Sequence, residues 1–409
     1  MSRLLNAFFK STWGNTSIPF EVLFADGTRY CNNKAQPKVT IRYKSRLAQL
    51  NTIINHGWGL LESYVNQGVD IDGDLKLLIR AAAETGPSLI ENTCQLRIPN
   101  PLIRIRNFWH EIRYGNRRLP QAVKNALFHY NRGSEIFWQY LDPTMTYTCA
   151  YWKNDTRTLA EAQENKLDHV CRKLMLKPGE RLIDVGGGWG SLLFHACEKY
   201  GVLGTNLSPT IDQNRWLRQK AKEKGLENKI AIQEKDFRQV EGVFDKYASL
   251  GVYEHAGKGQ LADWIRSMAK SLKSGGIGVL HFIAHDLSME TDFFIRKYIF
   301  PGGYLPGLAE TIEIMAKHGL EILDIENLRR HYALTLDAWA KNFDDKWEAI
   351  HRYDPERFNE KFRRTWRAYL QTCAEFFRTE NTVLRVYQIT FSKGNTKDYP
   401  MGREFLYQK

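Results

Sequence analysis

The sequence lacks the features that mark several large classes of protein. No apolar run approaches the roughly 18 residues that a bilayer-spanning helix needs. The apolar patch within residues 1–10 is too short for a signal-peptide core, although it suits a brief amphipathic start. The six cysteines show neither C-x-x-C spacing nor a disulfide framework. We therefore expect no zinc site and a reducing, cytoplasmic setting.

What the sequence has in excess is positive charge. Its 58 Lys and Arg residues outnumber 46 Asp and Glu residues, which gives a net charge of +12. Such an excess favours an anionic partner, either nucleic acid or an anionic lipid surface. Recognisable nucleic-acid modules, internal repeats and low-complexity tracts are missing, so we expect the anionic membrane surface and no nucleic acid.

The positive charge is concentrated between residues 102 and 124. This segment mixes basic with aromatic and aliphatic side chains and holds a single acid, Glu111. Basic and apolar residues at helical spacing suit an element at a membrane interface. A solvated helix face, or a basic connector at residues 84–125, fits the composition equally well. The basic residues are Arg104, Arg106, Arg113, Arg117, Arg118 and Lys124.

A chain of 409 residues is too long for one hydrophobic core. Residues 1–120 are predicted to form a small α+β unit followed by the basic connector, with strands at 20–24 and 39–43 and helices at 45–54 and 75–83. Residues 121–409 alternate strands with helices, which predicts a Rossmann-like α/β domain with a parallel sheet covered on both faces. Its expected strands are 182–185, 202–206, 230–233, 247–251, 278–283 and 383–391, and its helices include 191–200, 211–224 and 260–272, with a helical stretch at 336–377.

The most informative segment ends the first strand of this pattern. A buried acid leads into a turn with four glycines and then into a helix. Glycines let such a turn bend sharply and let a ligand approach the main chain. The acid followed by Gly-x-Gly-x-Gly favours S-adenosylmethionine (SAM) over a dinucleotide, and a tight turn without a ligand is the structural alternative. The residues are Asp184, Gly186, Gly187, Gly188, Trp189 and Gly190.

Polar residues also follow the other predicted strands. Ligands of this topology lie beyond the carboxyl ends of the strands, so these loops are expected to face one site. Asp236 and Phe237 could contact an adenine, although core packing is an equal alternative for Phe237. Glu254 would need hydrogen-bond partners if buried, and a lone histidine such as His281 is more often a structural residue than a catalyst.

Dispersed motifs give the chain a specific resemblance. From about His129 to the C-terminus they resemble, in order and spacing, the cyclopropane fatty acid synthase family, which includes the mycolic acid cyclopropane synthases and related lipid C-methyltransferases. The N-terminal unit resembles the lipid-binding domain of that family through residues 57–64 and 72–75. The catalytic motifs are residues 147–152, 184–190, 253–255, 281–283, 297–301 and 331–336.

The resemblance implies a reaction and its cofactor. The double bond of an unsaturated acyl chain of a membrane phospholipid attacks the SAM methyl group, and a bound bicarbonate ion removes a proton to close a cyclopropane. The residues implied to hold bicarbonate are Cys149, Glu254, His281, Ile283 through its backbone, and Tyr332. Cys373 matches a cysteine of the family to which a nucleophilic role has been assigned, and we expect it to pack. The implied SAM contacts add Tyr147, Thr148, Asn206, Ser208, Gln213, Asp236, Phe237 and Arg238 to the glycine loop.

Some residues depart from the family pattern. Gly187 stands where the family has cysteine, Asn206 replaces a common threonine, and Asn131 and Ser134 lose acidic character. Two rival activities follow, a C-methyltransferase that gives methyl- or methylene-branched chains and a non-catalytic lipid-binding protein. The resemblance also implies a homodimer, and we expect peripheral association with the inner face of the membrane.

Overall fold

The computed structural model describes residues 1–84, 101–130, 133–380 and 382–407. Asn131, and Cys94 as one of the six cysteines, lie outside them. The chain forms two compact units that are discontinuous in sequence. Unit 1 comprises Met1–Arg113, Glu290–Ile299 and Leu336–Val383, and unit 2 comprises Tyr114–Met289, Phe300–Thr335 and Leu384–Lys409.

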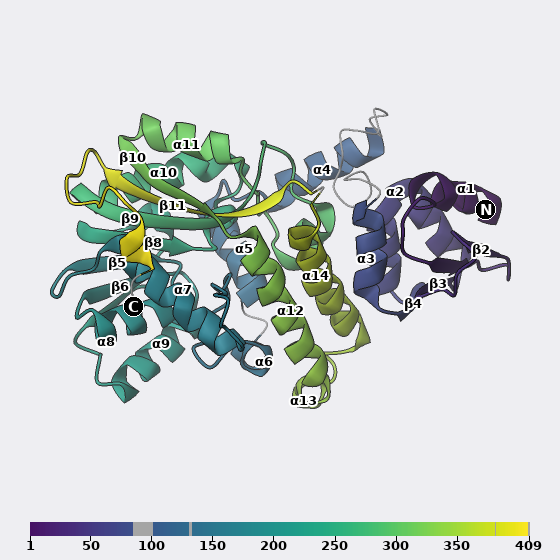
Figure 1. Ribbon diagram of the computed structural model, residues 1–409, viewed down its shortest axis with the longest axis horizontal. Helices are drawn as coiled ribbons and strands as arrows, with labels where there is room; N and C mark the ends of the chain where they lie inside the picture. The colour runs from purple at the N-terminus through teal and green to yellow at the C-terminus, as the bar shows by residue number, and fades with distance from the viewer. Residues whose placement is uncertain (85–100, 131–132, 381, 408–409) are drawn as a thin grey trace. The chain divides into compact units, whose positions relative to one another are not determined.

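A seven-stranded sheet organises unit 2 (Figure 1). Its strands run in the order β10-β11-β9-β8-β5-β6-β7; the five from β9 to β7 are parallel, and β11 is antiparallel to both β9 and β10. The strands are β5 (Arg181–Val185), β6 (Leu203–Leu207), β7 (Ile230–Gln233), β8 (Phe244–Leu250), β9 (Leu272–His285), β10 (Leu320–Asn327) and β11 (Leu384–Lys393).

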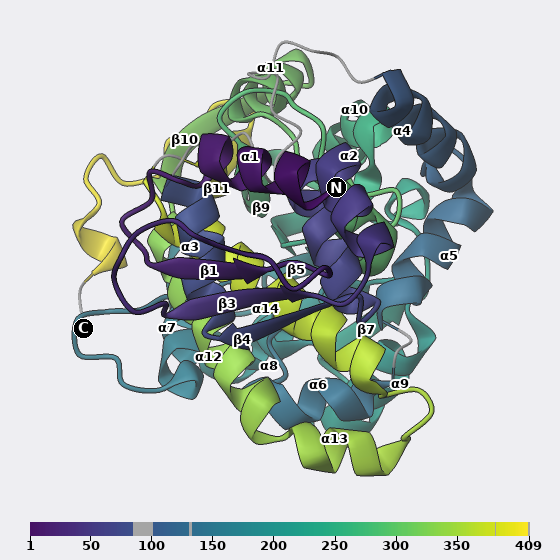
Figure 2. The ribbon, with the colours of Figure 1, turned by 90° about the vertical axis from the view of Figure 1, so that its right-hand side faces the viewer.

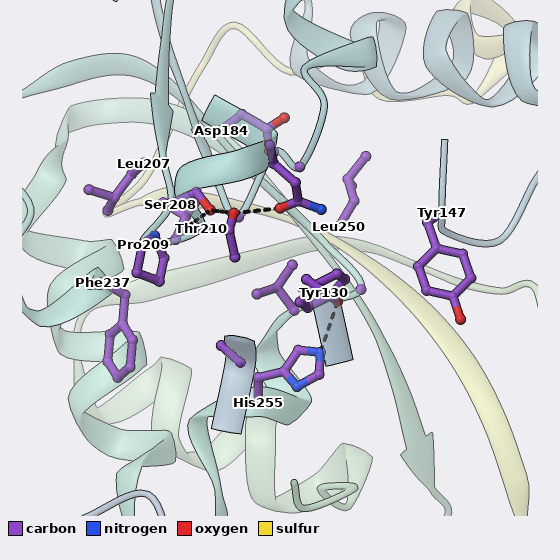
Figure 3. A pocket seen from close by; sticks show the side chains of 18 of the residues that line it. Tyr130, Tyr147, Asp184, Leu207, Ser208, Pro209, Thr210, Phe237, Leu250 and His255 are labelled. Atoms are coloured by element: carbon purple, nitrogen blue, oxygen red, sulfur yellow. Dashed lines mark hydrogen bonds between the residues drawn. The ribbon is translucent and has the colours of Figure 1, made fainter. Parts of the chain in front are cut away.

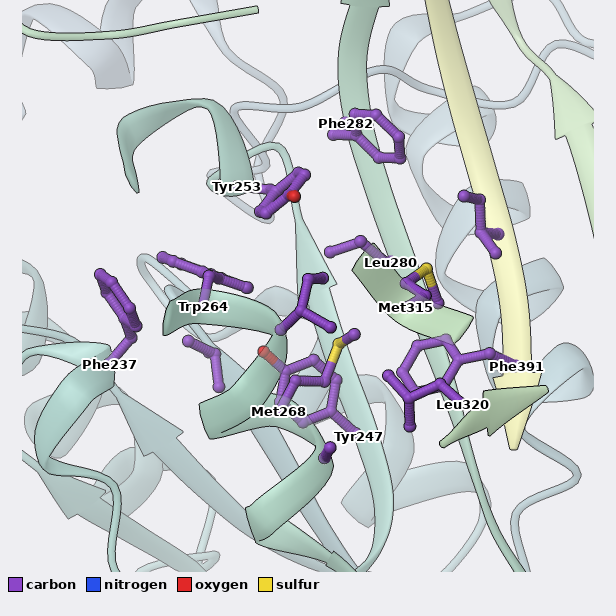
Figure 4. Packing of buried hydrophobic residues seen from close by; sticks show 14 of the residues in the cluster. Phe237, Tyr247, Tyr253, Trp264, Met268, Leu280, Phe282, Met315, Leu320 and Phe391 are labelled. Atoms are coloured by element: carbon purple, nitrogen blue, oxygen red, sulfur yellow. The ribbon is translucent and has the colours of Figure 1, made fainter. Parts of the chain in front are cut away.

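Helices cover both faces of this sheet because neighbouring strand residues point to opposite sides. Ile183 and Tyr247 belong to the core that also holds Trp264 and Met268 (Figure 4). Their neighbours in sequence, Leu182 and Ala248, belong to a second core under other helices. The helices of unit 2 are α5 (Leu119–Tyr130), α6 (Ser134–Tyr140), α7 (Leu159–Leu174), α8 (Ser191–Lys199), α9 (Ile211–Glu223), α10 (Leu261–Ser271) and α11 (Leu308–Lys317). The predicted α/β, Rossmann-like class is confirmed.

Unit 1 is built on a four-stranded sheet in the order β2-β1-β3-β4 (Figure 2). Buried residues of β1 and β3 alternate with more exposed ones, as expected for a sheet with one face on a core. The elements are α1 (Ser2–Thr12), β1 (Phe20–Leu23), β2 (Arg29–Cys31), β3 (Val39–Tyr43), α2 (Arg46–Val65), β4 (Val69–Gly73), α3 (Leu75–Glu84), α4 (Pro101–Tyr114), α12 (Arg329–Asp345), α13 (Trp347–Tyr353) and α14 (Glu360–Arg378), with the start of α12 in unit 2.

The division into units differs from the single boundary expected near residue 120. Helix α14 packs against α2 and α3 rather than against the large sheet. Two ion pairs hold it there, Arg364–Asp70 with a 2.9 Å N–O distance and Arg80–Glu375 with 2.9 Å. These long-range contacts fix residues 336–383 in unit 1, and the sequence pattern did not predict them.

The helical spacing noted between residues 102 and 124 is confirmed, because α4 and the start of α5 occupy most of that segment. The alternative of a connector was wrong there. Strand β10 was missed. No helix within the described ranges is both long enough and apolar enough to cross a bilayer.

A buried ion pair in unit 2 provides a test of the fold. Lys173 of α7 is fully buried, and its Nζ lies 2.6 Å from Oε2 of Glu326 on β10. His169 approaches the same oxygen at 2.8 Å. We expect Glu326→Gln to lower the free energy of unfolding by about 3 kcal/mol, because it leaves the ammonium without a counter-charge. Urea unfolding measures this, with the exposed Glu321→Gln on the same strand as control; equal losses in the two variants would contradict it.

Candidate active site

A large pocket opens at the carboxyl ends of the parallel strands of unit 2 (Figure 3). It encloses about 1150 Å³, its open mouth included. The loops after β5, β6, β7 and β8 contribute to its wall together with α5.

The glycine loop after β5 forms one wall of the pocket. Its backbone conformation and its close neighbours both favour residues without side chains. Gly186, Gly188 and Gly190 have positive φ of 77°, 57° and 84°, a region that glycine adopts without strain. At Gly187 the limit is space instead. A Cβ there would lie 2.6 Å from Oδ2 of Asp184 and 2.6 Å from Oδ1 of Asn206.

Two buried acceptors beside this loop have no donor among the described residues. They are Oδ1 of Asp184 and Oδ1 of Asn206. The orientation of Asn206 is set by its neighbour, since its Nδ2 donates to Asn214 Oδ1 at 2.9 Å and Asn214 Nδ2 donates to the Ser208 carbonyl at 2.9 Å. Unsatisfied buried acceptors are rare and costly. The ammonium group of an amino acid ligand such as SAM would satisfy the oxygen of Asp184, which lines the pocket.

Burial also sets the protonation of Asp184. It raises the pKa of this carboxyl to about 7, although the positive charge of Lys166 opposes the shift. Lys166 is itself buried on α7, and burial lowers its pKa to about 8. Its Nζ donates to Thr148 Oγ1 at 2.8 Å. A cationic ligand beside Asp184 would therefore favour the ionised carboxylate.

Hydrogen bonds between side chains shape the rest of the pocket. Ser208 Oγ lies 2.7 Å from Thr210 Oγ1, which donates to Gln213 Oε1 at 2.5 Å. On another side, Tyr130 of α5 contacts His255 with 3.2 Å between its hydroxyl and Nε2 (Figure 3). These contacts fix polar atoms of the wall before any ligand arrives.

Asp236 and Phe237 follow β7, as predicted. Asp236 caps a short 3-10 helix and pairs with Arg238, at 2.6 Å between Oδ1 and Nε. The ring of Phe237 lies 4.4 Å from that of Trp264 and also lines the pocket. Both alternatives considered for Phe237, core packing and pocket lining, describe its position.

Twelve of the fourteen predicted SAM contacts line the pocket, whereas Gly190 and Asn206 do not. Gly190 packs so closely against α9 that an added Cβ would lie 2.7 Å from Leu217. Asn206 is paired with Asp184 across the neighbouring strands β5 and β6. Contact with SAM itself stays a prediction for the twelve, Tyr147, Thr148, Asp184, Gly186, Gly187, Gly188, Trp189, Ser208, Gln213, Asp236, Phe237 and Arg238.

The second set of predicted residues, those implied to hold bicarbonate, includes Glu254. This residue directly precedes His255 of the pocket wall, and its carboxyl is buried. Its Oε1 accepts the backbone N–H of Ile283, while its Oε2 has no hydrogen-bond partner in the described part of the chain. Burial raises the pKa of Glu254 to about 7, and the hydrogen bond from Ile283 opposes the shift. The Ile283 N–H, expected to hold bicarbonate, is thus occupied by Glu254.

The remaining members of this group are uncharged. Burial lowers the pKa of His281 to about 3, and its Nδ1 lies 3.2 Å from Nε2 of Gln388. Burial raises the pKa of the Cys149 thiol far above its ordinary value. Cys149 Sγ lies 3.8 Å from the carbonyl oxygen of Leu328, which also accepts the Tyr332 N–H at 3.1 Å. The structure therefore brings Cys149 close to Tyr332 and Glu254 close to Ile283.

An anion suits this group because its members can donate hydrogen bonds while carrying no negative charge themselves. A protonated Glu254 presents Oε2 as a donor, and the thiol of Cys149 stays neutral. Glu254 and Cys149 thus have donor chemistry that suits bicarbonate, and its binding by the five residues stays a prediction.

Cys373 lies on α14 of unit 1. Burial raises the pKa of its thiol to about 12, and the charge of Asp292 adds to the shift. A thiol that stays protonated at neutral pH is a poor nucleophile. This agrees with the expected packing role.

The sequence analysis missed several residues of the pocket wall. Lys166, Tyr130 and Asn125 all line it. The signal for Lys166 was a lysine within the apolar periodicity of a helix, a position normally avoided by unpaired charge. Tyr130 and Asn125 lie on α5, which fell within the predicted connector and its border.

Gly187 gives a prediction about space in the loop. We expect Gly187→Cys to weaken binding of S-adenosylhomocysteine (SAH) roughly tenfold or more, because its Cβ overlaps Asp184 and Asn206. Adding Asn206→Thr should recover part of the affinity by removing one of the two obstructing atoms. Calorimetry measures both, with Gly259→Cys as control because its nearest neighbour lies 3.7 Å away. Unchanged affinity in Gly187→Cys would refute the overlap.

Asp184 gives a prediction about protons. A carboxyl with a pKa of about 7 is mostly protonated at pH 6. Binding an ammonium ligand beside it favours the ionised form, so SAH binding at pH 6 should release protons and should tighten as the pH rises toward 8. Calorimetry in buffers of different ionisation enthalpy counts these protons. Proton release that persists in Asp184→Asn would assign it to another group.

Comparisons with known proteins identify the family of this chain. The profile of the family described as mycolic acid cyclopropane synthetase matches residues 117–389, and a domain of unknown function (DUF7884) matches residues 4–94. A probable fatty acid methyltransferase of Pseudomonas putida is 34% identical over 404 residues, covering 96% of this chain and 97% of that protein. The cyclopropane-fatty-acyl-phospholipid synthase of Escherichia coli K12 is 34% identical over 267 residues, which cover 65% of this chain and 67% of the relative.

A solved structure extends the likeness to the fold. Mycolic acid cyclopropane synthase CmaA1 complexed with SAH and CTAB has a TM-score of 0.61 at 30% identity, covering 66% of this chain and 98% of that one. The predicted resemblance is thereby confirmed. The chain belongs to the mycolic acid cyclopropane synthetase family and is a SAM-dependent methyltransferase.

Proposed function

We propose that this methyltransferase converts a double bond in the acyl chain of a membrane phospholipid into a cyclopropane. The observation that carries the proposal is the buried Oε2 of Glu254, a carboxyl oxygen without a partner among the described residues, one residue from the wall of the cofactor pocket. A methyl transfer alone needs no such group. Removing a proton after the transfer does, because the proton needs a path away from the carbocation.

The reaction balances in two steps. SAM, when bound, supplies an electrophilic methyl group. The π electrons of the alkene form a bond to that carbon as the carbon–sulfur bond breaks, which leaves a carbocation on the neighbouring alkene carbon. Loss of a proton from the new methyl group then gives its C–H electrons to the third bond of the ring. No oxidant or reductant is required.

The residues around Glu254 hold and orient the base in this proposal. Bicarbonate, when bound, would supply the base for the proton. The Ile283 N–H binds one oxygen of Glu254. This hydrogen bond restricts rotation of the carboxyl group and so holds the other oxygen in one orientation. His281 stays neutral because of its burial, and the thiol of Cys149 stays protonated. The proposal adds the phenol of Tyr332 as a further holder, so that a single anion would be held among neutral groups beside the developing cation.

A second candidate is favoured by the name of the Pseudomonas relative, a probable fatty acid methyltransferase. A C-methyltransferase could leave an exocyclic methylene after a hydride shift, with the same loss of one proton. It could also leave a saturated methyl branch, which requires an added hydride. The third alternative, a non-catalytic lipid-binding protein, predicts a chain that binds no SAH.

Lipid analysis of a host that makes no cyclopropane fatty acids tests the proposal. Expression of the full chain should give phospholipid acyl chains with the upfield NMR signals of cyclopropane protons. Vinylic methylene signals, with no ring signals, would instead establish the methyltransferase alternative. Unmodified acyl chains from a chain that also fails to bind SAH would establish the non-catalytic one.

Glu254→Gln separates proton removal from cofactor binding. The amide can keep the hydrogen bond from Ile283 but cannot present an acidic hydrogen or a carboxylate at Oε2. We expect ring formation to fall at least about a hundredfold, as for loss of an acid–base group, while SAH affinity stays within about threefold. Cys373→Ser serves as the matched control and should keep nearly full activity. Normal ring formation by Glu254→Gln would show that Glu254 takes no part in the reaction.

A further inference from the structure

Helix α4 carries a row of large apolar side chains that face solvent. Ile105, Phe108, Trp109 and Ile112 are 53, 62, 63 and 60% exposed. Their spacing of i, i+3, i+4 and i+7 places them on one side of the helix. Helices normally turn such a stripe toward a core, and exposed clusters of this kind mark contact surfaces. We call these four residues the α4 stripe.

The opposite side of α4 is held by contacts within unit 1. The guanidinium of Arg106 lies 3.9 Å from the ring centroid of Phe293 and 4.8 Å from that of Trp58. Asn107 Nδ2 donates to Glu290 at 2.8 Å. The ring of His110 meets that of Phe293 at 5.2 Å. Because these polar residues take the inward side, the helix is fixed with its apolar stripe outward.

Arginines border the stripe on both sides. Arg104 precedes Ile105 and Arg113 follows Ile112, and both are exposed. Glu111 is half-buried. It lies on the flank of the helix, between the side that contacts unit 1 and the side that carries the stripe. Two more exposed arginines, Arg117 and Arg118, follow the helix in sequence. The surface therefore combines an apolar centre with a basic rim.

We propose that the α4 stripe is the surface with which this protein docks on a bilayer that contains anionic lipid. This rests on the proposed function, because a phospholipid substrate lies in such a bilayer. Aliphatic and aromatic side chains insert at the boundary between headgroups and acyl chains, where Trp109 is especially suited. Arg104 and Arg113 would then meet lipid phosphates.

Charge favours the membrane over a second copy of the chain as occupant of this surface. Two copies packing through the stripe would gather Arg104 and Arg113 of both copies, four positive charges, around one interface. Helix α4 supplies no exposed acid to offset them. An anionic lipid surface gives both arginines opposite charge instead.

Vesicle sedimentation tests the docking surface with the full chain. The probe is large vesicles of equal parts phosphatidylglycerol and phosphatidylcholine. We expect Phe108→Ser with Trp109→Ser to reduce the vesicle partition coefficient roughly tenfold or more. Leu287→Ser with Met401→Ser is the matched control, since both side chains are exposed on loops of unit 2, and it should partition like the wild type.

Charge variants test the rim. Arg104→Gln with Arg113→Gln should weaken binding to the phosphatidylglycerol vesicles several-fold and remove part of its salt dependence. Their binding to pure phosphatidylcholine should hardly change. Unchanged partition of the Phe108/Trp109 variant on both vesicles would overturn the proposal. So would a wild-type dimer that becomes monomeric in that variant while its vesicle binding persists.

An activity measurement keeps this proposal separate from the proposed function. With unsaturated phospholipid dispersed in detergent, the Phe108/Trp109 variant should methylate at the wild-type rate, whereas on vesicles it should be slower by at least about tenfold. A wild type that modifies neither form would contradict the proposed function, and the sedimentation result would still decide the docking surface. Equal loss of activity on both forms would show damage to the site rather than to docking.

Discussion

The burial of Asp184 at the end of β5 is the constraint on which the cofactor site depends. A carboxyl group there loses hydration, so its pKa rises to about 7 and one of its oxygens has no donor among the described residues. The chain compensates only in part, through the charge of Lys166. The glycine at 187 leaves the space beside both Asp184 and Asn206 free of a side chain. The site is thus built to be completed by a cationic donor, and the amino acid end of SAM is one.

Two carboxyl groups with similar pKa values serve different purposes in this account. Asp184 lies near a lysine and opens to the cofactor pocket, so ligand binding drives it toward the carboxylate. Glu254 accepts a hydrogen bond from the Ile283 N–H, but its burial favours the acid form, and a bound anion would favour that form further. The environment, and not the residue type, separates a group that binds from one that manages a proton.

Much of unit 2 was predictable because its strands are short apolar runs between turns, a pattern that buried parallel strands impose. The glycine loop and the polar strand ends followed from the same topology. The use of the Ile283 N–H by Glu254 did not, since it depends on a side-chain rotamer. Nor did the place of α14, because two long-range ion pairs decide it. The orientation of helix α4 was also not predicted, because its apolar side faces solvent while Arg106 faces inward.

The central claim is that a proton leaves the transferred methyl group. The most direct measurement uses SAM with a fully deuterated methyl group, the purified full chain and an unsaturated phospholipid, with mass spectrometry of the product chain. The account predicts that two deuterium atoms remain on the added carbon, in a product whose NMR spectrum shows a cyclopropane ring. Retention of all three would contradict it, because the new methyl group would then have kept every one of its hydrogens.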